Sequence, residues 1–128
     1  TYVDNISGEN IKLILEDGAD NIFHEDPYRQ QGGDMVRVGG MDYTIDPTKK
    51  IGNRIQDMRL DDGTKIEADK EYSVAGWASV SPNPREGKDI WDVVAEYLRA
   101  EKVATVKKLN TPKLVNVQGN PGLADYNA

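Results

Sequence analysis

Apolar residues recur at two different spacings along the chain, and each spacing predicts a different kind of element. Ile11, Leu15 and Ala19 return every four residues, which is typical of the buried face of an α-helix. Ser7 stands just before them, and its hydroxyl can accept a hydrogen bond from a free amide of the first turn. The pattern therefore predicts a helix over residues 7–23.

A second run with helical spacing lies in the C-terminal half. Asp89 occupies an N-cap position, and Asp92 follows three residues later at the position of a capping box. These signals predict a helix over residues 89–100. The side chains expected on its buried face are Ile90, Val93, Val94, Tyr97 and Leu98. Trp91 and Tyr97 are both interpreted as core residues.

Shorter segments alternate apolar and polar residues, as half-buried strands do. The predicted strands are residues 41–45, 55–60 and 72–75, with a further extended stretch over 114–117. Asp61-Asp62-Gly63 follows the second strand, and an Asp-Gly step favours a tight hairpin because glycine readily adopts positive φ. We expect the first three strands to lie in one sheet.

The order of elements predicts an α+β fold, a mixed β-sheet with helices packed on it. A chain of 128 residues has a natural size for one domain, so residues 1–128 are interpreted as a single domain. The segment SPNPREGKD, residues 81–89, contains two prolines and a glycine and is predicted as a loop.

Composition excludes several classes of protein. Hydrophobic residues make up 38% of the chain and charged residues 30%, as in an ordinary globular domain, and no apolar run approaches membrane-spanning length. The net charge of −6, with Lys and Arg spread along the chain, disfavours binding to nucleic acid or to an anionic membrane. Cysteine is absent, which excludes disulfides and thiol chemistry.

The residues give little sign of a catalytic centre. The one histidine, His24, stands beside Glu25 and Asp26, but neighbours in sequence rarely converge on one metal, and we interpret this group as a solvated helix end. Ser79 and Ser81 have no histidine nearby for a catalytic triad.

One stretch carries unusually many glycines and hydrogen-bonding side chains. Residues 28–40 read YRQQGGDMVRVGG. The glycine spacing fits neither a P-loop nor a dinucleotide fingerprint, both of which also need a following helix. On the residues alone the chain is an α+β domain with an unexplained glycine-rich segment.

The order of motifs over residues 7–76 resembles the C-terminal domain of the 5'-nucleotidase family. GGDMVRVGGMDYTIDP is similar to the family's glycine-rich segment and the strand ending in Tyr-Asp-Pro, and NRIQDMRLDDGTKIEADKEYSVAGW is similar to its polar hairpin and following strand. The chain departs from nucleotidases after residue 76. It reads GWASVSPNPREGKDIWDVV, where they carry a Gly-Gly-Asp-Gly-aromatic loop that stacks on the base.

Other motifs resemble the thiosulfohydrolase branch of that family, SoxB. These are DPYRQQGGDMVRVGG, AGWA, IWDVVAEYL and NTPKLVNVQGNPG. This resemblance implies a two-domain periplasmic hydrolase that releases sulfate from a cysteine-S-thiosulfonate on the SoxYZ carrier protein. The chain opens without an initiator Met, and we expect it to be the C-terminal part. The implied cofactors, two manganese ions, would be held by the metallophosphatase-like N-terminal domain. The fragment alone, with no cofactor of its own, is expected to be inactive.

The resemblance also gives the glycine-rich segment a role at the substrate channel. Arg37 is the first candidate for contacting a sulfonate or the carrier's peptide arm, because its guanidinium offers a fork of donors; pairing with Asp34 or Asp42 is the structural alternative. Tyr28 is the second candidate and Trp77 the third, with core packing as the alternative for both rings. Further substrate-binding candidates are Gln30, Gln31, Gly32 and Gly33.

Two other functions remain open on the sequence. The chain is alternatively the substrate-binding C-terminal domain of a 5'-nucleotidase or related phosphoesterase. It is alternatively a non-enzymatic module that binds a peptide through the glycine-rich segment. Arg85, in the proline-containing loop, is either a contact for the carrier or a solvated charge.

Overall fold

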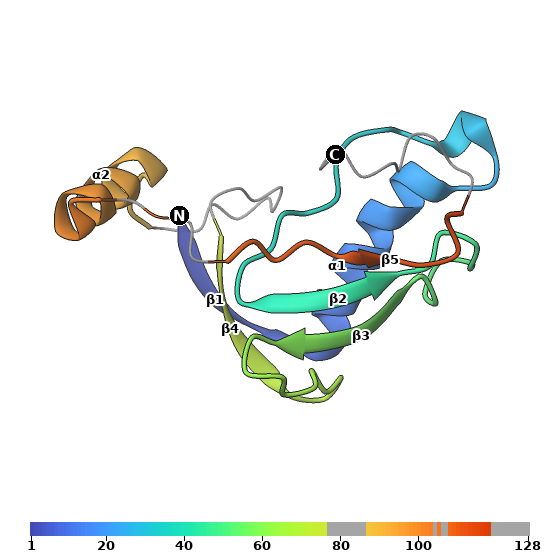
Figure 1. Cartoon of the computed structure of the whole chain (residues 1–128), viewed down its shortest axis with the longest axis horizontal. Coiled ribbons are helices and arrows are strands. Elements are labelled where there is room, and N and C mark those ends of the chain that lie inside the picture. The colour runs from blue at the N-terminus through green and yellow to red at the C-terminus, as the bar shows by residue number, and fades with distance from the viewer. Residues whose placement is uncertain (77–86, 104, 106–107, 119–128) are drawn as a thin grey trace.

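The computed structural model describes residues 1–76, 87–103, 105 and 108–118. In chain order the elements are β1 (Tyr2–Ser7), α1 (Gly8–Phe23), a 3-10 turn η1 (Pro27–Arg29), β2 (Met41–Ile45), β3 (Ile55–Leu60), β4 (Glu71–Gly76), α2 (Ile90–Glu101) and β5 (Lys113–Leu114). Figure 1 shows α1 beside the strands β2, β3 and β5, while α2 lies apart from them near the N-terminus. The mixture of helices and sheets confirms the α+β prediction.

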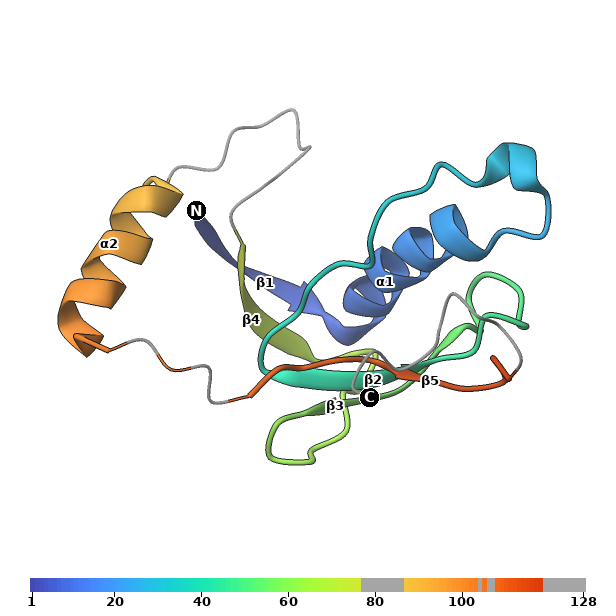
Figure 2. The same cartoon turned by 45° about the horizontal axis from the view of Figure 1, so that its top comes forward.

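Helix α1 begins and ends where the sequence predicts. The Ser7 side chain accepts a hydrogen bond from the Asn10 amide, and Pro27 soon follows the last turn. Leu15 and Ala19 are 2% and 0% exposed, so the four-residue spacing does mark the buried face. Figure 2 shows this helix lying along one face of the three-stranded sheet.

The three-stranded sheet has the order β3-β2-β5. Strand β2 is antiparallel to β3 and parallel to β5, with Ile45 opposite both Ile55 and Leu114. The predicted hairpin is confirmed, since Gly63 adopts φ +86° and the Leu60 amide donates to the Thr64 carbonyl at 2.8 Å. The buried hydrophobic residues of the core are Leu15, Ala19, Met41, Tyr43, Ile45, Ile55, Met58 and Ile66.

The expectation of one sheet for three predicted strands is wrong. Strand β4 pairs antiparallel with β1 in a separate two-stranded sheet, from Tyr2 opposite Gly76 to Ser7 opposite Glu71. Its partner β1 is an element that the sequence pattern did not reveal, because apolar positions in Tyr2–Ser7 are too few to mark a strand. Gly8 then lets α1 start close to the backbone of Glu67, where a Cβ would not fit.

Helix α2 is present as predicted, but its surroundings differ from the prediction. Every side chain expected on its buried face is at least partly exposed, and none of the helix is buried. The interpretation of Trp91 and Tyr97 as core residues is wrong, since they are 66% and 54% exposed. The Asp89 side chain makes no capping hydrogen bond. Amphipathic spacing fixed the helix but did not supply a surface to cover it.

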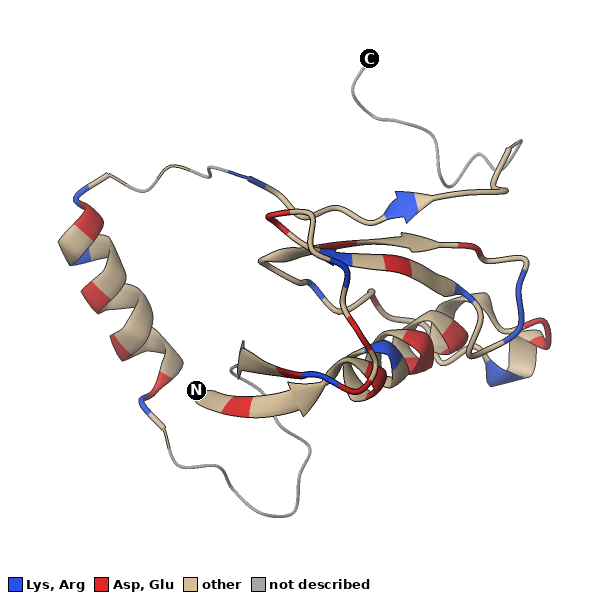
Figure 3. Ribbon diagram, turned by 90° about the horizontal axis from the view of Figure 1, so that it is seen from below, with Lys and Arg blue, Asp and Glu red and all other residues tan. Residues whose placement is uncertain are grey.

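No helix within the described part of the chain is long and apolar enough to cross a membrane. Lys and Arg positions are distributed over several separate elements in Figure 3 and alternate with acidic positions. Basic and acidic positions are thus intermixed along the described chain.

Candidate functional site

The glycine-rich segment, residues 28–40, connects the turn η1 to β2. Two apolar side chains of this segment, Met35 and Val38, pack against the core, and Met35 lies 3.9 Å from the Cβ position of Gly18 on α1. The Gly32 amide donates to the Asn21 carbonyl at 3.2 Å. The segment is thus fixed to α1 at several points along its length.

The polar side chains of the segment remain outside. Tyr28 is 99% exposed, so the alternative of core packing is wrong for this ring. The Gln30 side chain donates to the His24 carbonyl at 2.7 Å and so holds the end of α1, while Gln31 is exposed. A segment anchored by apolar residues therefore presents an aromatic ring and amide groups to solvent.

Arg37 is another exposed polar residue of the glycine-rich segment. Its side chain is 90% exposed, and its guanidinium lies 3.5 Å from the Asp34 carboxylate, which is itself 82% exposed. Asp42, the other acid considered as a partner, instead accepts hydrogen bonds from Lys108 and Asn110. An ion pair of this length and exposure stabilises a fold little, so the guanidinium can turn to another anion at small cost.

The glycines of the segment serve its conformation. Gly32, Gly33 and Gly40 have φ of +73°, +99° and +83°, values that non-glycine residues rarely adopt. No protein atom lies within 4 Å of the Cβ positions of these glycines. The positive φ values alone therefore explain the choice of glycine, and the open space beside Gly32 and Gly33 leaves their backbone accessible to a ligand.

The histidine group behaves as a helix end. The His24 amide donates to the Asp20 carbonyl at 3.0 Å, and its Nδ1 accepts from the Asp26 amide at 3.0 Å. Among the described residues no group of three or more His, Cys, Asp or Glu side chains could hold a metal ion. Two other candidates of the sequence analysis, Trp77 and Arg85, lie outside the described residues.

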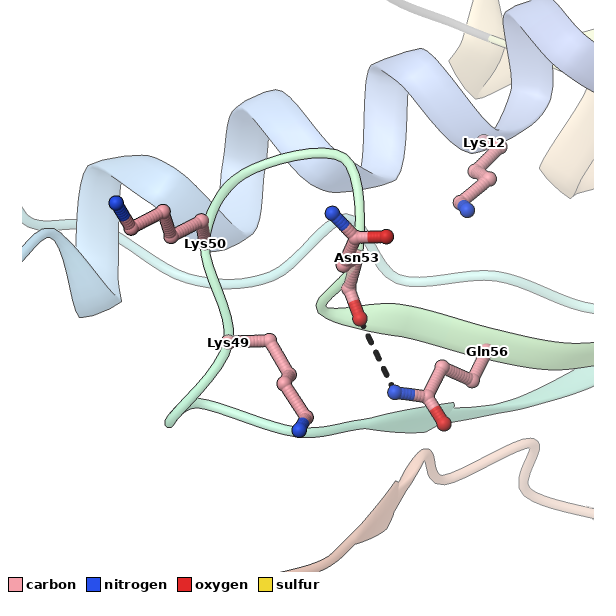
Figure 4. Close-up of a pocket in the computed structure, with 5 residues that line it drawn as sticks. All are labelled: Lys12, Lys49, Lys50, Asn53 and Gln56. Atoms are coloured by element: carbon pink, nitrogen blue, oxygen red, sulfur yellow. Dashed lines mark hydrogen bonds between the residues drawn. The ribbon is translucent and has the colours of Figure 1, made fainter.

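A second feature, which the sequence analysis did not single out, is an open hollow of about 510 Å³ between α1 and the loop joining β2 to β3. Its lining consists of Lys12, Lys49, Lys50, Asn53 and Gln56. In Figure 4 the three ammonium groups point in different directions around the rim and do not converge. The Lys49-Lys50 pair was the available signal, but Lys12 joins it only through the packing of α1.

Two carboxylates near the start of β2 bind one lysine. The Lys108 ammonium donates to Asp42 at 2.7 Å and to Asp61 at 2.5 Å, and Asn110 donates to both acids. The Lys108 hydrogen bond is the main cause that lowers the pKa of each carboxyl group, and the same bonds raise the pKa of Lys108. Lys108 balances one of the two negative charges and Asn110 satisfies further acceptors, so we interpret this acid pair as a structural contact.

Comparison with known proteins gives two kinds of relative. The family model for the C-terminal domain of 5'-nucleotidase matches residues 1–96. A curated relative is 31% identical over 78 residues: the trifunctional nucleotide phosphoesterase protein YfkN of Bacillus subtilis (strain 168). The match covers 58% of this chain and 5% of that protein.

The second relative is a solved structure, the sulfate thiohydrolase SoxB of Thermus thermophilus in complex with glycerol. It is similar over 90% of this chain, with a TM-score of 0.71 and 33% sequence identity. The chain spans 22% of the SoxB chain. Both relatives are therefore several times longer than the region that resembles this chain.

Proposed function

Because the chain belongs to the family of 5'-nucleotidase C-terminal domains, we propose that it is the C-terminal, substrate-channel domain of a longer hydrolase of the SoxB type. The reaction proposed for the whole enzyme is release of sulfate from a cysteine-S-thiosulfonate on the SoxYZ carrier protein. The observation that carries this proposal is the similarity to SoxB over 90% of the chain at 33% identity. The proposed location is the periplasm.

The proposal divides the work between two parts of the enzyme. An N-terminal metallophosphatase-like domain would hold two manganese ions and carry the hydrolytic chemistry. The described residues of this chain do not gather metal ligands, so no chemical step is assigned to them. Their part is to bind and orient the substrate, and the isolated chain is expected to hydrolyse nothing.

The glycine-rich segment is the proposed substrate contact. Arg37 is held only by a 3.5 Å contact to one exposed acid, which leaves its donors available to the oxygens of a sulfonate. The substrate-facing residues proposed beside it are Tyr28, Gln30, Gln31, Gly32, Gly33 and Trp77. The Gln30 side chain also donates to the His24 carbonyl, which helps to keep the segment in place.

The test is substitution of Arg37 in the full-length enzyme. Arg37→Ala should lower kcat/KM for the carrier-bound thiosulfonate by about ten- to a hundredfold, since a hydrogen bond to a charged group contributes roughly 1.5–3 kcal/mol. Arg37→Lys should retain part of the rate because it keeps the charge but loses the planar fork. The thermal midpoint should hardly change in either variant.

The matched control is Arg59→Ala, an arginine of β3 that pairs with Asp57 outside the segment. The Arg59→Ala enzyme should turn over the carrier-bound thiosulfonate as fast as the unmodified enzyme does. Equal turnover of Arg37→Ala and Arg59→Ala would remove Arg37 from the site. A large fall in the thermal midpoint of Arg37→Ala would show that the arginine is structural.

A second candidate is the C-terminal domain of a nucleotide phosphoesterase, which the similarity to YfkN favours. Tyr28, with its ring 99% exposed, offers an aromatic face on which a base can stack. The full-length enzyme assayed on both substrate classes separates the candidates. Turnover of 5'-nucleotides with none of the carrier-bound thiosulfonate would replace the first proposal with the second.

A further inference from the structure

Helix α2 presents an apolar face that nothing described in the structure covers. By helical spacing the polar residues Asp92, Glu96 and Arg99 share one side of the helix, while Glu101 lies in the last turn among the apolar positions. The large apolar residues occupy the other side: Trp91, Val93, Val94, Tyr97 and Leu98, which are 66%, 37%, 46%, 54% and 46% exposed. Five large apolar side chains on a helix of 12 residues form a concentrated exposed patch. Such patches mark contact surfaces.

An isolated helix of this length is only marginally stable in water. Short helices gain most of their stability from packing an amphipathic face and little from propensity. The ion pair of Lys88, which lies just before the helix, with Glu96 of α2 is a polar contact, and both side chains are more than half exposed. The apolar face is therefore built for a partner.

The neighbouring β1–β4 sheet is also incomplete. Within the described residues each of the two strands pairs only with the other, and two strands alone are marginally stable. Val3 is 74% exposed and lies opposite Ala75, which is also exposed. Val3 and Ala75 thus add two exposed apolar side chains on the same part of the molecule.

Both α2 and the β1–β4 sheet adjoin the first residue of the chain. The Thr1 hydroxyl donates to the Lys88 carbonyl at 2.6 Å, directly before α2, and Thr1 leads into β1. Figures 1 and 2 both place the N-terminus beside α2. Residues joined to Thr1 in a longer polypeptide would enter the molecule next to the uncovered face.

We propose that polypeptide preceding Thr1 in the longer hydrolase packs on the apolar face of α2 and completes this end of the domain. The inference rests on the proposed function only in taking the chain as part of a longer polypeptide, as its 22% share of SoxB supports. A covalently joined segment has a high effective concentration at this face. A second copy of the chain is disfavoured by the net charge of −6, because like charges oppose association.

The first test compares hydrogen exchange of the α2 amides, residues 90–101, in the isolated chain and in the longer enzyme. Packing against upstream residues should slow exchange at least about tenfold in the longer enzyme, because opening then requires loss of tertiary contacts. Equal exchange rates in the two proteins would overturn the proposal. Slowing that appears in the isolated chain only as its concentration rises would assign the face to a second copy instead.

The second test uses paired double variants of the longer enzyme. Val94→Gln with Leu98→Gln should abolish the slowed exchange of α2, whereas Asp92→Gln with Arg99→Gln on the polar side should preserve it. Glutamine is a good helix former, so both pairs keep the helix itself. Equal loss in the two pairs would contradict a specific apolar contact. Should the first pair fail to fold, the comparison of unmodified proteins still decides.

These outcomes are distinguishable from failure of the proposed function. Slowed exchange in a longer enzyme that does not hydrolyse the carrier-bound thiosulfonate would retain this inference and reject the SoxB-type reaction. Hydrolysis of the carrier-bound thiosulfonate together with equal exchange rates of α2 in both proteins would retain the SoxB-type reaction and reject this inference.

Discussion

Two regions of this molecule place their apolar side chains in opposite environments. The body, formed by α1, the β3-β2-β5 sheet and the loop that follows β3, holds all eight buried hydrophobic residues of the core. The other end, formed by α2 and the β1–β4 pair, contributes no buried residue to that cluster, although Tyr72 of β4 packs against it and α2 is as clearly amphipathic as α1. The difference shows that an amphipathic pattern indicates that one face of a helix needs to be covered, but it does not identify the segment that covers it.

Buried polar groups reinforce the body. The Glu16 carboxylate, 1% exposed, accepts from the Gly52 amide at 2.8 Å and the Ile55 amide at 2.7 Å. The Arg54 guanidinium, 6% exposed, pairs with Asp20, which lies on α1 like Glu16. These contacts fix the loop between β2 and β3 onto α1. At α2, by contrast, the ion pair of Lys88 with Glu96 is more than half exposed at both side chains.

The largest expected effect compares the same substitution in the two regions. Leu15→Ala in α1 should lower the free energy of unfolding by about 2–5 kcal/mol, because it leaves a cavity in a closed core. Leu98→Ala in α2 should change it by about 0.5 kcal/mol or less in the isolated chain, since the side chain is 46% exposed. Urea denaturation of both variants measures the contrast.

A loss for Leu98→Ala as large as that for Leu15→Ala would break the comparison. It would mean that α2 is already packed in the isolated chain. In the longer enzyme the losses of unfolding free energy caused by Leu98→Ala and Leu15→Ala should be more similar, because the apolar face of α2 is then packed.

A smaller loss is expected for Glu16→Ala. The buried amide of Ile55 then has no acceptor, which costs roughly 1–3 kcal/mol, and the part-buried amide of Gly52 adds less. Glu16→Gln retains one carbonyl acceptor and should recover part of the loss. Thermal unfolding of the two variants, with the exposed acid Asp17→Ala of the same helix as control, measures it. Equal midpoints for Glu16→Ala and Asp17→Ala would show that the carboxylate does not hold the loop.

The smallest expected effect is a pH dependence at Asp42 and Asp61. Hydrogen bonds from Lys108 lower the pKa of both carboxyl groups in the folded state, so their contribution to stability is present above the unfolded pKa. It is lost as the pH falls below about 4 through the folded pKa values. The raised pKa of Lys108 removes its contribution only at strongly alkaline pH.

The double variant Asp42→Asn, Asp61→Asn tests this dependence. It should be slightly less stable than the unmodified chain at pH 7, and the difference should vanish at low pH. Thermal midpoints between pH 3 and pH 7 give the comparison. A difference that is constant over this range would mean that charge is not what these acids contribute.

The sequence by itself determined the local elements. Ser7, the four-residue spacing and Pro27 set the bounds of α1, and the Asp62-Gly63 step set the hairpin, because caps, helical periodicity and positive φ act between near neighbours. The motifs over residues 7–76 also indicated the family, since a family pattern is carried by residue order. The substrate roles of Arg37 and its neighbours are not fixed by either kind of signal and stay predictions.

Only the tertiary structure decided which elements meet. It paired β4 with β1 and not with β2, and placed β5 parallel beside β2. It also brought Lys12 to the Lys49-Lys50 turn and left the apolar face of α2 uncovered by the described residues. Strand alternation specifies which face is buried but not which strand lies alongside, since pairing depends on backbone hydrogen bonds between segments far apart in sequence. The burial of a helix face depends in the same way on a surface that its own residues do not encode.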